Sequence, residues 1–482
     1  MMEPRSHIAC SIGDLVARTR IQALHVMGSP DAVVSGVCLD SRDVAPGDLF
    51  CCVPGRGVDG HDFAHEAVAK GATALLVEHD VAGVDDSVTR IVTSNVRAMM
   101  GPVSAALYGW PSSKLCVVGV TGTNGKTTTT AMLAAIFENS GHRTRVLGTL
   151  TGSRTTPEAP ELQRFFADAL ANGVSHIAME VSSHALDQLR VDGTTFAAVA
   201  FTNLGRDHLD YHETTERYFA AKASLFTRDF APIAVINSDD VHGRLLIDAR
   251  SGTTVPVSRH DVTNICVTTE SVSFRWRNSD VVVPIGGDFN VDNAIVACET
   301  AKALGFSDDQ ICTGLALLPP VQGRFQSVPN SLGLHVIVDY AHTPEALERL
   351  LTAVSKNDDA RLIVVFGCGG DRDAGKRPVM GALAARHADV VVVTSDNPRH
   401  EDPAAIIEQI VAGVDKESLN RVTAVVDRRA AIITAIEQAH GGDVIVIAGR
   451  GHESQQDIAG VMHDFDDAVI ARGVLQDLEA RA

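Results

Sequence analysis

The chain has 482 residues, of which 45% are hydrophobic and 21% charged, a composition typical of a globular protein with several domains and not of a disordered or fibrous one. Its formal net charge of -19, without any block of clustered Lys and Arg, argues against nucleic acid or a membrane surface as a partner. Apolar runs such as 388–394 and 443–448 are only as long as strands, and no apolar stretch of signal-peptide length opens the chain, so we expect a cytoplasmic protein.

The first 111 residues are predicted to form a separate α/β domain. They lack the phosphate-binding features found further along, and Tyr108-Gly109-Trp110-Pro111 closes them with a turn signal. Within them, Leu39-Asp40-Ser41-Arg42 is typical, on local chemistry alone, of a side-chain-stabilised turn before a strand. The nine cysteines of the chain show no metal-ligand spacing, so we expect neither disulfides nor zinc. Cys51 and Cys52 are predicted to lie on a strand, one pointing inward and the other outward.

Residues 112–322 are predicted to form a central domain around a parallel sheet. Short β-branched runs at 115–120, 176–181, 197–201 and 232–236 alternate with longer helical patterns, which is typical of α/β domains. The weaker pattern at 250–285 predicts an antiparallel edge or a small subsheet.

The strongest local signal is a phosphate loop in this central domain. The segment 117–128 runs from a strand through Thr121-Gly122-Thr123-Asn124-Gly125 into a helix that starts near Lys126. Glycines let backbone N–H groups surround phosphate oxygens, Lys126 supplies a point charge, and Thr127 offers a hydroxyl to magnesium. The usual phosphate-loop pattern begins with a glycine, and this chain departs from it by having Val120 at that position.

Two further clusters follow predicted strands. Glu180 ends the strand at 176–181, where open α/β sheets bind ligands, and a carboxylate there can hold a metal. The loop at 202–212 brings Arg206, Asp207 and His208 together after the next strand. A single histidine among 19 is more often structural than functional, but the phosphate loop and Glu180 favour a functional His208.

Residues 323–482 are predicted to form a third, Rossmann-like domain. Strand patterns at 335–339, 361–366, 389–394, 421–426 and 443–448 alternate with Ala-rich helical stretches. The segment 317–324, with paired prolines and a glycine, is the predicted linker and hinge. After 389–394 comes Asp396-Asn397-Pro398-Arg399, which turn chemistry alone would make a simple strand-ending turn.

Taken together, these motifs resemble the Mur ligase and folylpolyglutamate synthase superfamily. The phosphate loop without a leading glycine is similar to that family's loop, and the resemblance spans nearly the whole chain. It continues through the segments 180–184, 206–211, 218–226, 339–344 and 370–377. Gly449-Arg450-Gly451-His452-Glu453 resembles the family's Gly-Lys-Gly-His-Glu, with Arg450 in place of lysine.

The resemblance implies an ADP-forming ligase that uses ATP and Mg²⁺, with Lys126, His208 and Lys222 as catalytic residues. It also implies that Lys222 is carbamylated, although the sequence alone favours an ordinary surface lysine on a helix. The implied magnesium ligands are Thr127, Glu180, His208 and Lys222 as its carbamate. The implied ATP-binding residues are Gly122, Thr123, Asn124, Gly125, Lys126, Thr127, Thr128, Asn293, Arg324 and Asp339.

Within the family, the resemblance is to the diaminopimelate-adding members, because Asp396–Arg399 is similar to their amino-acid-recognising motif. The other implied substrate is a UDP-N-acetylmuramoyl dipeptide, extended at its D-glutamate side chain. The residues implied for that precursor are Ser41, Thr155, Thr156, Ser182, Gln188, Arg190 and Lys222. Those implied for diaminopimelate are Arg372, Asp396, Asn397, Arg399, Gly449 and Glu453.

Three alternatives remain open from the sequence. A lysine-adding Mur ligase would share most motifs, and folylpolyglutamate synthase shares the phosphate loop but lacks the first domain and the Asp396–Arg399 motif. A nucleotide-binding relative without catalysis is disfavoured, because Glu180, His208 and Lys222 are all present. We expect a monomer.

Overall fold

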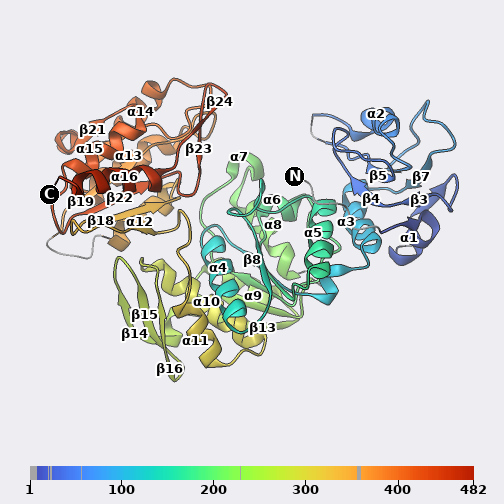
Figure 1. Ribbon diagram of the computed structural model, residues 1–482, viewed down its shortest axis with the longest axis horizontal. Helices are drawn as coiled ribbons and strands as arrows, with labels where there is room; N and C mark the ends of the chain where they lie inside the picture. The colour runs from blue at the N-terminus through green and yellow to red at the C-terminus, as the bar shows by residue number, and fades with distance from the viewer. Residues whose placement is uncertain are drawn as a thin grey trace.

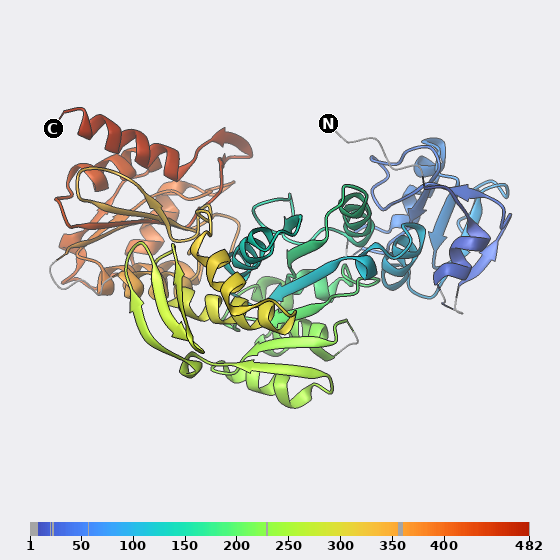
Figure 2. The same cartoon turned by 60° about the horizontal axis from the view of Figure 1, so that its bottom comes forward.

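The computed structural model describes residues 8–19, 21, 24–55, 57–227, 230–354 and 360–481. Three α/β domains follow one another along the molecule, with the first and the third at opposite ends and the central one between them (Figures 1 and 2). This confirms the predicted fold class; the exact boundaries at residues 111 and 322 stay a prediction. Within the described residues, none of the helices has the length and apolar character needed to cross a membrane.

The N-terminal domain is a five-stranded sheet with helices on both faces. Its strand order is β2 (His25–Met27), β7 (Thr89–Val92), β6 (Ala74–Val77), β5 (Asp48–Cys51) and β4 (Gly36–Cys38), with only β2 antiparallel to its neighbour. Helices α1 (Ile12–Thr19) and α3 (Val96–Leu107) share one apolar cluster, and α2 (Ala64–Ala69) belongs to another. A short antiparallel pair, β1 (Cys10–Ser11) and β3 (Val33–Val34), adjoins α1.

The expectation that one of the two adjacent cysteines would point outward is wrong. Cys51 and Cys52 are both fully buried, each in a different apolar cluster. They do point to opposite sides, but helices cover both faces of this largely parallel sheet, so neither side faces water.

The central domain is built on a six-stranded, wholly parallel sheet. Its order is β13 (Thr253–Val257), β12 (Ile233–Asn237), β11 (Ala198–Phe201), β8 (Cys116–Thr121), β10 (His176–Glu180) and β9 (Thr144–Leu147). The four strands predicted from the sequence form the middle of the sheet, and β9 and β13, which the patterns did not separate, are its edges. The predicted subsheet exists as three antiparallel strands, β14 (Val262–Val267), β15 (Val272–Trp276) and β16 (Ser279–Val283).

Helices cover both faces of the central sheet. One face packs against α4 (Lys126–Asn139), α10 (Phe289–Ala303) and α11 (Asp308–Ala316), and the other against α5 (Ala159–Ala171), α8 (Thr215–Thr227) and α9 (Val241–Ala249). The short helices α6 (Ser183–Asp187) and α7 (Leu209–His212) follow β10 and β11. Since β8 lies between β10 and β11 and all three strands are parallel, the loops that follow them lie together at the carboxyl end of the sheet.

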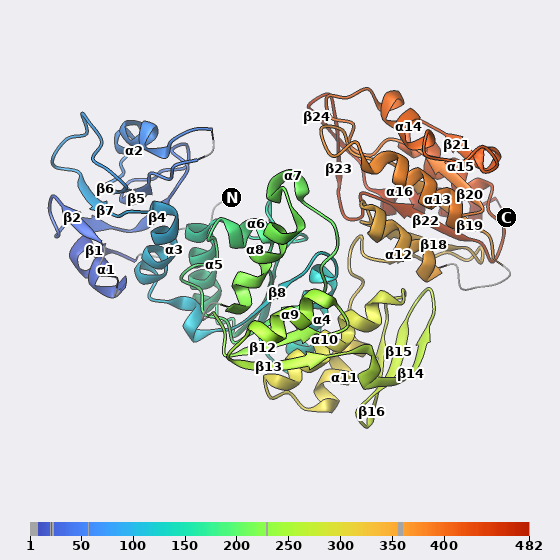
Figure 3. The same cartoon turned by 180° about the vertical axis from the view of Figure 1, so that it is seen from behind.

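The C-terminal domain repeats this layered plan. Its strand order is β17 (Gln326–Val328), β18 (His335–Asp339), β22 (Val444–Ala448), β19 (Leu362–Phe366), β20 (Val390–Val393) and β21 (Val422–Ala424), all parallel except β17. One face packs on α12 (Pro344–Val354), α13 (Lys376–His387) and α14 (Pro403–Val411), and the other on α15 (Arg428–Glu437) and α16 (Asp467–Glu479). A hairpin, β23 (Gln455–Ile458) and β24 (Val461–Asp464), lies on the side of this domain nearest α7 (Figure 3).

Candidate active site

The phosphate loop connects β8 to α4 and depends on its two glycines. Gly122 has φ +152° and Gly125 has φ +87°, which other residues rarely adopt. A Cβ atom on Gly125 would lie 2.2 Å from Oδ1 of Asn293, and one on Gly122 would lie 1.9 Å from Oγ1 of Thr202. Val120 still belongs to β8, where it pairs with Glu180, so that position needs no glycine.

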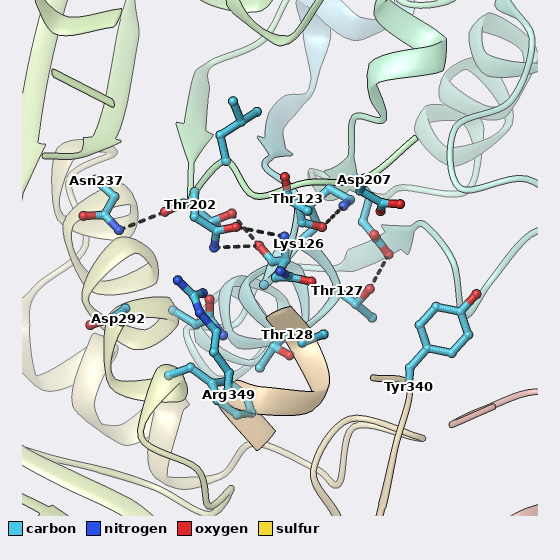
Figure 4. A pocket seen from close by; sticks show the side chains of 18 of the residues that line it. Thr123, Lys126, Thr127, Thr128, Thr202, Asp207, Asn237, Asp292, Tyr340 and Arg349 are labelled. Atoms are coloured by element: carbon cyan, nitrogen blue, oxygen red, sulfur yellow. Dashed lines mark hydrogen bonds between the residues drawn. The ribbon is translucent and has the colours of Figure 1, made fainter. Parts of the chain in front are cut away.

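A cavity of about 530 Å³ opens at this loop. Figure 4 shows Thr123, Lys126 and Thr127 of the loop, together with Tyr340 and Arg349 of the C-terminal domain, which also line the cavity. Nine of the ten residues predicted to bind ATP line this cavity; Gly122 is the exception. The lining also contains all four predicted magnesium ligands, Thr127, Glu180, His208 and Lys222.

Thr127 and Glu180 form the most tightly held part of the cavity wall. The Thr127 hydroxyl donates to Oε1 of Glu180 at 3.0 Å and accepts a hydrogen bond from the Arg324 guanidinium at 3.2 Å. Glu180 is 1% exposed and also accepts from the backbone N–H and the hydroxyl of Thr149. A hydroxyl and a carboxylate oxygen this close together fit one hard cation such as magnesium.

Two lysines lie beside the loop, Lys126 partly buried and Lys222 fully buried. Lys126 Nζ donates to the carbonyls of Gly122 and Thr123, each at 2.9 Å. Lys222, 1% exposed, donates to the Gly122 carbonyl at 2.8 Å and lies over the Tyr218 ring. Burial, together with the neighbouring Lys126 cation, holds the pKa of Lys222 well below its usual value, which favours its neutral amine.

Three of the predicted ATP-binding residues that line this cavity, Asn293, Arg324 and Asp339, lie outside the phosphate loop. Asn293 on α10 is 5% exposed and donates to Oδ1 of Asn290 at 2.9 Å. Arg324 lies over the Tyr340 ring, and its Nε atom is buried without a hydrogen-bond partner. Asp339 accepts from the N–H groups of Phe325 and Ala341, so it holds the start of the C-terminal domain in place.

A second cavity, of about 880 Å³, lies on the C-terminal domain side of the first. The two cavities share the wall residues Asp207, His208, Tyr340 and His342. His208 has a left-handed backbone, with φ +53°, and its Nε2 lies 3.4 Å from Oδ2 of Asp207. Burial lowers the pKa of His208 to about 4, against the opposing effect of Asp207, so the ring is neutral near pH 7 and able to ligate a metal.

All six residues predicted to bind the amino acid line this second cavity: Arg372, Asp396, Asn397, Arg399, Gly449 and Glu453. The Asn397 side-chain amide donates to Oε2 of Glu453 at 2.7 Å. Burial, followed by the nearby Asp396 carboxylate, raises the pKa of Glu453. Arg399 also has a left-handed backbone, with φ +50°, and donates to the Gly370 carbonyl at 2.6 Å.

The residues predicted to hold the precursor do not all come together. Thr155 and Ser182 line the first cavity, and Thr156 lies beside them, donating to the Glu180 carbonyl at 2.9 Å. Ser41 lies in the N-terminal domain, lines neither cavity, and donates to Glu66 at 3.1 Å.

Arg190 and Gln188 form a hydrogen-bonded pair next to this group. Arg190 donates to Oε1 of Gln188 at 2.7 Å and forms an ion pair with Glu158 at 3.0 Å. Arg97 of the N-terminal domain reaches the same carboxylate at 3.2 Å. The single negative charge of Glu158 thus faces the positive charges of Arg97 and Arg190, so the net charge of this group, between the first two domains, is positive.

The sequence prediction assigned no role to several residues of the cavity walls. Tyr340 and His342 directly follow β18, at the strand end where ligands bind in such sheets, and that position was the signal for them. Tyr218 on α8 opens the segment 218–226 that carried the resemblance, but it was given no role, and Arg349 lies inside α12, where nothing local distinguishes it from other helix residues.

A group of possible metal ligands outside these cavities consists of Asp59, His61 and His79, whose ligand atoms lie within 4.8 Å of one another. Both ring nitrogens of His61 are already engaged, one by Asp59 at 2.6 Å and the other by the N–H of Glu78 at 3.0 Å. The His61 ring stacks on His79 at 4.2 Å. We therefore interpret this group as part of the fold of the N-terminal domain.

Comparison with known proteins agrees with these features. Residues 33–108 match the family described as Mur ligase family, catalytic domain; residues 120–301 match the Mur ligase middle domain; and residues 323–451 match the Mur ligase, glutamate ligase domain. The chain is 42% identical, over 479 residues, to UDP-N-acetylmuramoyl-L-alanyl-D-glutamate–2,6-diaminopimelate ligase of Geobacillus kaustophilus, an alignment that covers 94% of this chain and 97% of the relative. It is 41% identical over 470 residues to the ligase of the same name from Syntrophomonas wolfei, with 93% and 96% coverage.

A solved structure of a UDP-N-acetylmuramoyl-L-alanyl-D-glutamate–2,6-diaminopimelate ligase has the same fold. It superposes with a TM-score of 0.70 at 33% identity, covering 98% of this chain and 99% of the other. The agreement extends over all three domains, and the middle domain match contains the phosphate loop, Glu180, His208 and Lys222. The chain therefore belongs to the Mur ligase family.

Proposed function

We propose that this chain is an ATP-dependent ligase that joins diaminopimelate to the D-glutamate side-chain carboxylate of UDP-N-acetylmuramoyl-L-alanyl-D-glutamate, a cytoplasmic step in peptidoglycan precursor synthesis. The observation that carries the proposal is the shared wall between the two cavities. A phosphate-loop cavity meets a cavity lined by Arg372, Arg399 and Glu453 along Asp207, His208 and Tyr340. An activated group made in the first cavity thus lies next to an amine held in the second. The relatives named above carry this activity in their names.

The chemistry requires two successive transfers. A bare carboxylate is a poor electrophile, so the terminal phosphoryl group of ATP first passes to a carboxylate oxygen, which gives an acyl phosphate and ADP. The amine of diaminopimelate then attacks the acyl carbon, forms the C–N bond, loses a proton and expels phosphate. Lys126 and the loop N–H groups at the start of α4 stabilise the negative charge on the transferred phosphoryl group.

The residues present fit magnesium at this site. Thr127 and Glu180 offer two oxygen ligands 3.0 Å apart. Neutral His208 offers a nitrogen, and Lys222, once carbamylated, would offer carboxylate-like oxygens as a ligand for a second ion. When bound, magnesium supplies positive charge that offsets the phosphoryl oxygens. A buried, neutral Lys222 amine is a nucleophile that carbon dioxide can carbamylate, and its hydrogen bond goes to a carbonyl, not to a carboxylate.

The adenosine half of ATP is proposed to lie against Asn293, Arg324 and Asp339. Arg324 has one nitrogen on Thr127 and a buried Nε without a partner, so a bound nucleotide would satisfy a polar group that the protein leaves unpaired. Asn293 lines the cavity beside Gly125. Because Gly125 has no side chain, the amide of Asn293 can lie directly against the phosphate loop.

The precursor is proposed to extend from the central cavity to the N-terminal domain. Thr155, Thr156 and Ser182 lie next to Glu180, where the D-glutamate carboxylate must meet ATP. The positive charge at Arg190 suits the anionic parts of the precursor, and Ser41 is proposed to contact its uridine diphosphate end. The elongated arrangement of domains requires a long substrate to connect these groups (Figure 2).

Phosphate release by the purified protein tests this proposal. With ATP, magnesium and the UDP-linked dipeptide, we expect release to depend on diaminopimelate and to be much slower with L-lysine or L-glutamate. Release that follows lysine would assign the chain to the lysine-adding ligases, and release that follows glutamate on a folate substrate would assign it to the folylpolyglutamate synthases. A protein that binds ATP but releases no phosphate with any amino acid would contradict the proposed activity.

A further inference from the structure

The fully buried Arg450 lies just after β22 and lines neither cavity, but it contacts two residues proposed to bind the amino acid. It is 0% exposed, and its guanidinium lies 5.3 Å from the centre of the Phe465 ring. One terminal nitrogen donates to Oδ1 of Asn397 at 2.9 Å. The other donates to the carbonyls of Gln455 at 2.8 Å and Phe465 at 3.2 Å. These carbonyls lie at the start of β23 and just after β24, so one side chain spans both stems of the hairpin.

The hairpin in turn holds the loop that carries Arg399. The backbone N–H of Arg399 donates to the Asp457 carbonyl at 3.1 Å, and the Arg399 carbonyl accepts from the N–H of Ala459 at 2.6 Å. The N–H of Asp457 also donates to Oδ1 of Asn397 at 2.9 Å. Arg399 has a left-handed backbone, φ +50°, which is unfavourable for a residue with a side chain and which these hairpin contacts must offset.

The same contacts determine the orientation of the Asn397 amide. Its oxygen accepts from both Arg450 and Asp457, so its nitrogen must point the other way, toward Glu453, to which it donates at 2.7 Å. One guanidinium that lines neither cavity therefore holds Arg399 through the hairpin and Glu453 through Asn397, with its own Nη1 3.9 Å from Oε2 of Glu453.

We infer that Arg450 is a positioning residue for the amino-acid cavity, acting through Asn397 and the hairpin β23–β24 on the two groups that would take the charged far end of diaminopimelate. This inference rests on the proposed function for its substrate. In this chain the planar guanidinium makes these contacts, because two nitrogens in fixed geometry reach three acceptors on three segments, whereas a lysine ammonium offers a single nitrogen.

The test compares Arg450→Lys with the wild type and with Arg361→Lys. Arg361 pairs with Asp443 and the Gln438 carbonyl at the opposite end of β22, so it controls for loss of a buried-carboxylate pair in the same domain. We expect Arg450→Lys to raise the KM for the amino acid by about tenfold or more, while the KM values for ATP and precursor stay within about twofold. Arg361→Lys should leave all three KM values unchanged.

A second readout does not depend on activity. Amide hydrogen exchange over 455–464 and at Arg399 should accelerate in Arg450→Lys and not in Arg361→Lys, because the hairpin loses its anchor. If kcat falls with all KM values unchanged, or if exchange in the hairpin is the same as in the wild type, Arg450 is merely structural and the inference is wrong. A wild-type protein that adds no amino acid would contradict the proposed function, and hydrogen exchange would still decide the role of Arg450.

Discussion

At the level of single residues, the chemical state of the Lys222 side chain, ammonium, neutral amine or carbamate, determines whether it can bind magnesium. Its side chain is buried, and its hydrogen bond goes to the Gly122 carbonyl, which a protonated amine and a neutral amine can both make. A cation in that place would repel magnesium, whereas a carbamate would bind it. The surroundings therefore favour chemical modification over a permanent ammonium group.

Replacing Lys222 by Ala tests this. We expect a loss of activity on the order of 100-fold or more, since an ionic ligand near the transferred phosphoryl group disappears. Short carboxylic acids such as acetate should restore part of it by occupying the vacated ligand position. The measurement is phosphate release with and without the acid, with Lys302→Ala on α10, whose lysine pairs with Asp308, as the control. Full activity of Lys222→Ala without an additive would contradict the carbamate.

Arg399 is expected to determine the choice of amino acid. Diaminopimelate differs from lysine by one carboxylate, and a planar guanidinium in the cavity wall can bind that carboxylate through two hydrogen bonds. With charge-assisted bonds at roughly 1.5–3 kcal/mol each, the wild type should prefer diaminopimelate over lysine by about a thousandfold. In Arg399→Ala the preference should collapse, mainly through weaker use of diaminopimelate. The comparison is kcat/KM for the two amino acids in both proteins, and an unchanged ratio would refute the assignment.

At the level of elements, the packing of α4 against β10 has a consequence for pH. His176 at the start of β10 lies 5.0 Å from the Phe137 ring and 4.0 Å from the His142 ring, centre to centre. Burial, reinforced by His142, lowers the pKa of His176 to about 4 from the usual 6.5. The unfolded chain therefore binds a proton at this position more readily than the folded protein does.

Stability should consequently fall as the pH drops from about 6.5 toward about 4, and the contribution of His176 is on the order of 2 kcal/mol. Above pH 6.5 the folded protein loses no stability through His176, because the ring is neutral in both the folded and the unfolded state. In His176→Phe, which keeps an aromatic ring in the cluster and cannot titrate, the fall should be smaller. Urea unfolding at pH 7 and pH 5 in both proteins measures the difference, and an equal fall in both would contradict the assigned cause.

The sequence predicted the phosphate loop with Gly122 and Gly125, but it did not predict which residues pack against that loop. Their need for positive φ follows from the short connection between β8 and α4, which the sequence already indicated. The neighbours that forbid a Cβ atom are Thr202, just after β11, and Asn293 on α10, and they could be found only in the folded protein.

At the scale of the whole molecule, the residues proposed to bind the substrates belong to three different domains. The precursor would reach from Ser41 in the first domain to Glu180 in the second, and the amino acid would sit against the third. The linker at 317–324 joins the last two, and Arg324 at its end already contacts Thr127. An acyl phosphate must be protected from water, so we expect the domains to close around the bound substrates.

Small-angle X-ray scattering measures that closure. The radius of gyration should be smaller with a non-hydrolysable ATP analogue and the precursor together than for the free protein, because both ligands bridge domains. ADP alone serves as the control, since it occupies the nucleotide site without the precursor and should reduce the radius of gyration less than both ligands together. An identical radius of gyration with and without both ligands would argue against a hinge at the linker.

The sequence by itself determined the three α/β domains, the phosphate loop and the amino-acid motif, because each is written in contiguous residues whose spacing has a local physical cause. Val120 inside β8, the charges at Asp396–Arg399 and the apolar strand runs are of this kind. Only the tertiary structure decided the rest. It brought Tyr218 and Arg349 into the cavity wall, paired Arg190 with Glu158, buried both Cys51 and Cys52, and placed Arg450 between a hairpin and Asn397. These features depend on which segments pack together although they are far apart in the sequence. Local sequence patterns carry no information about such contacts.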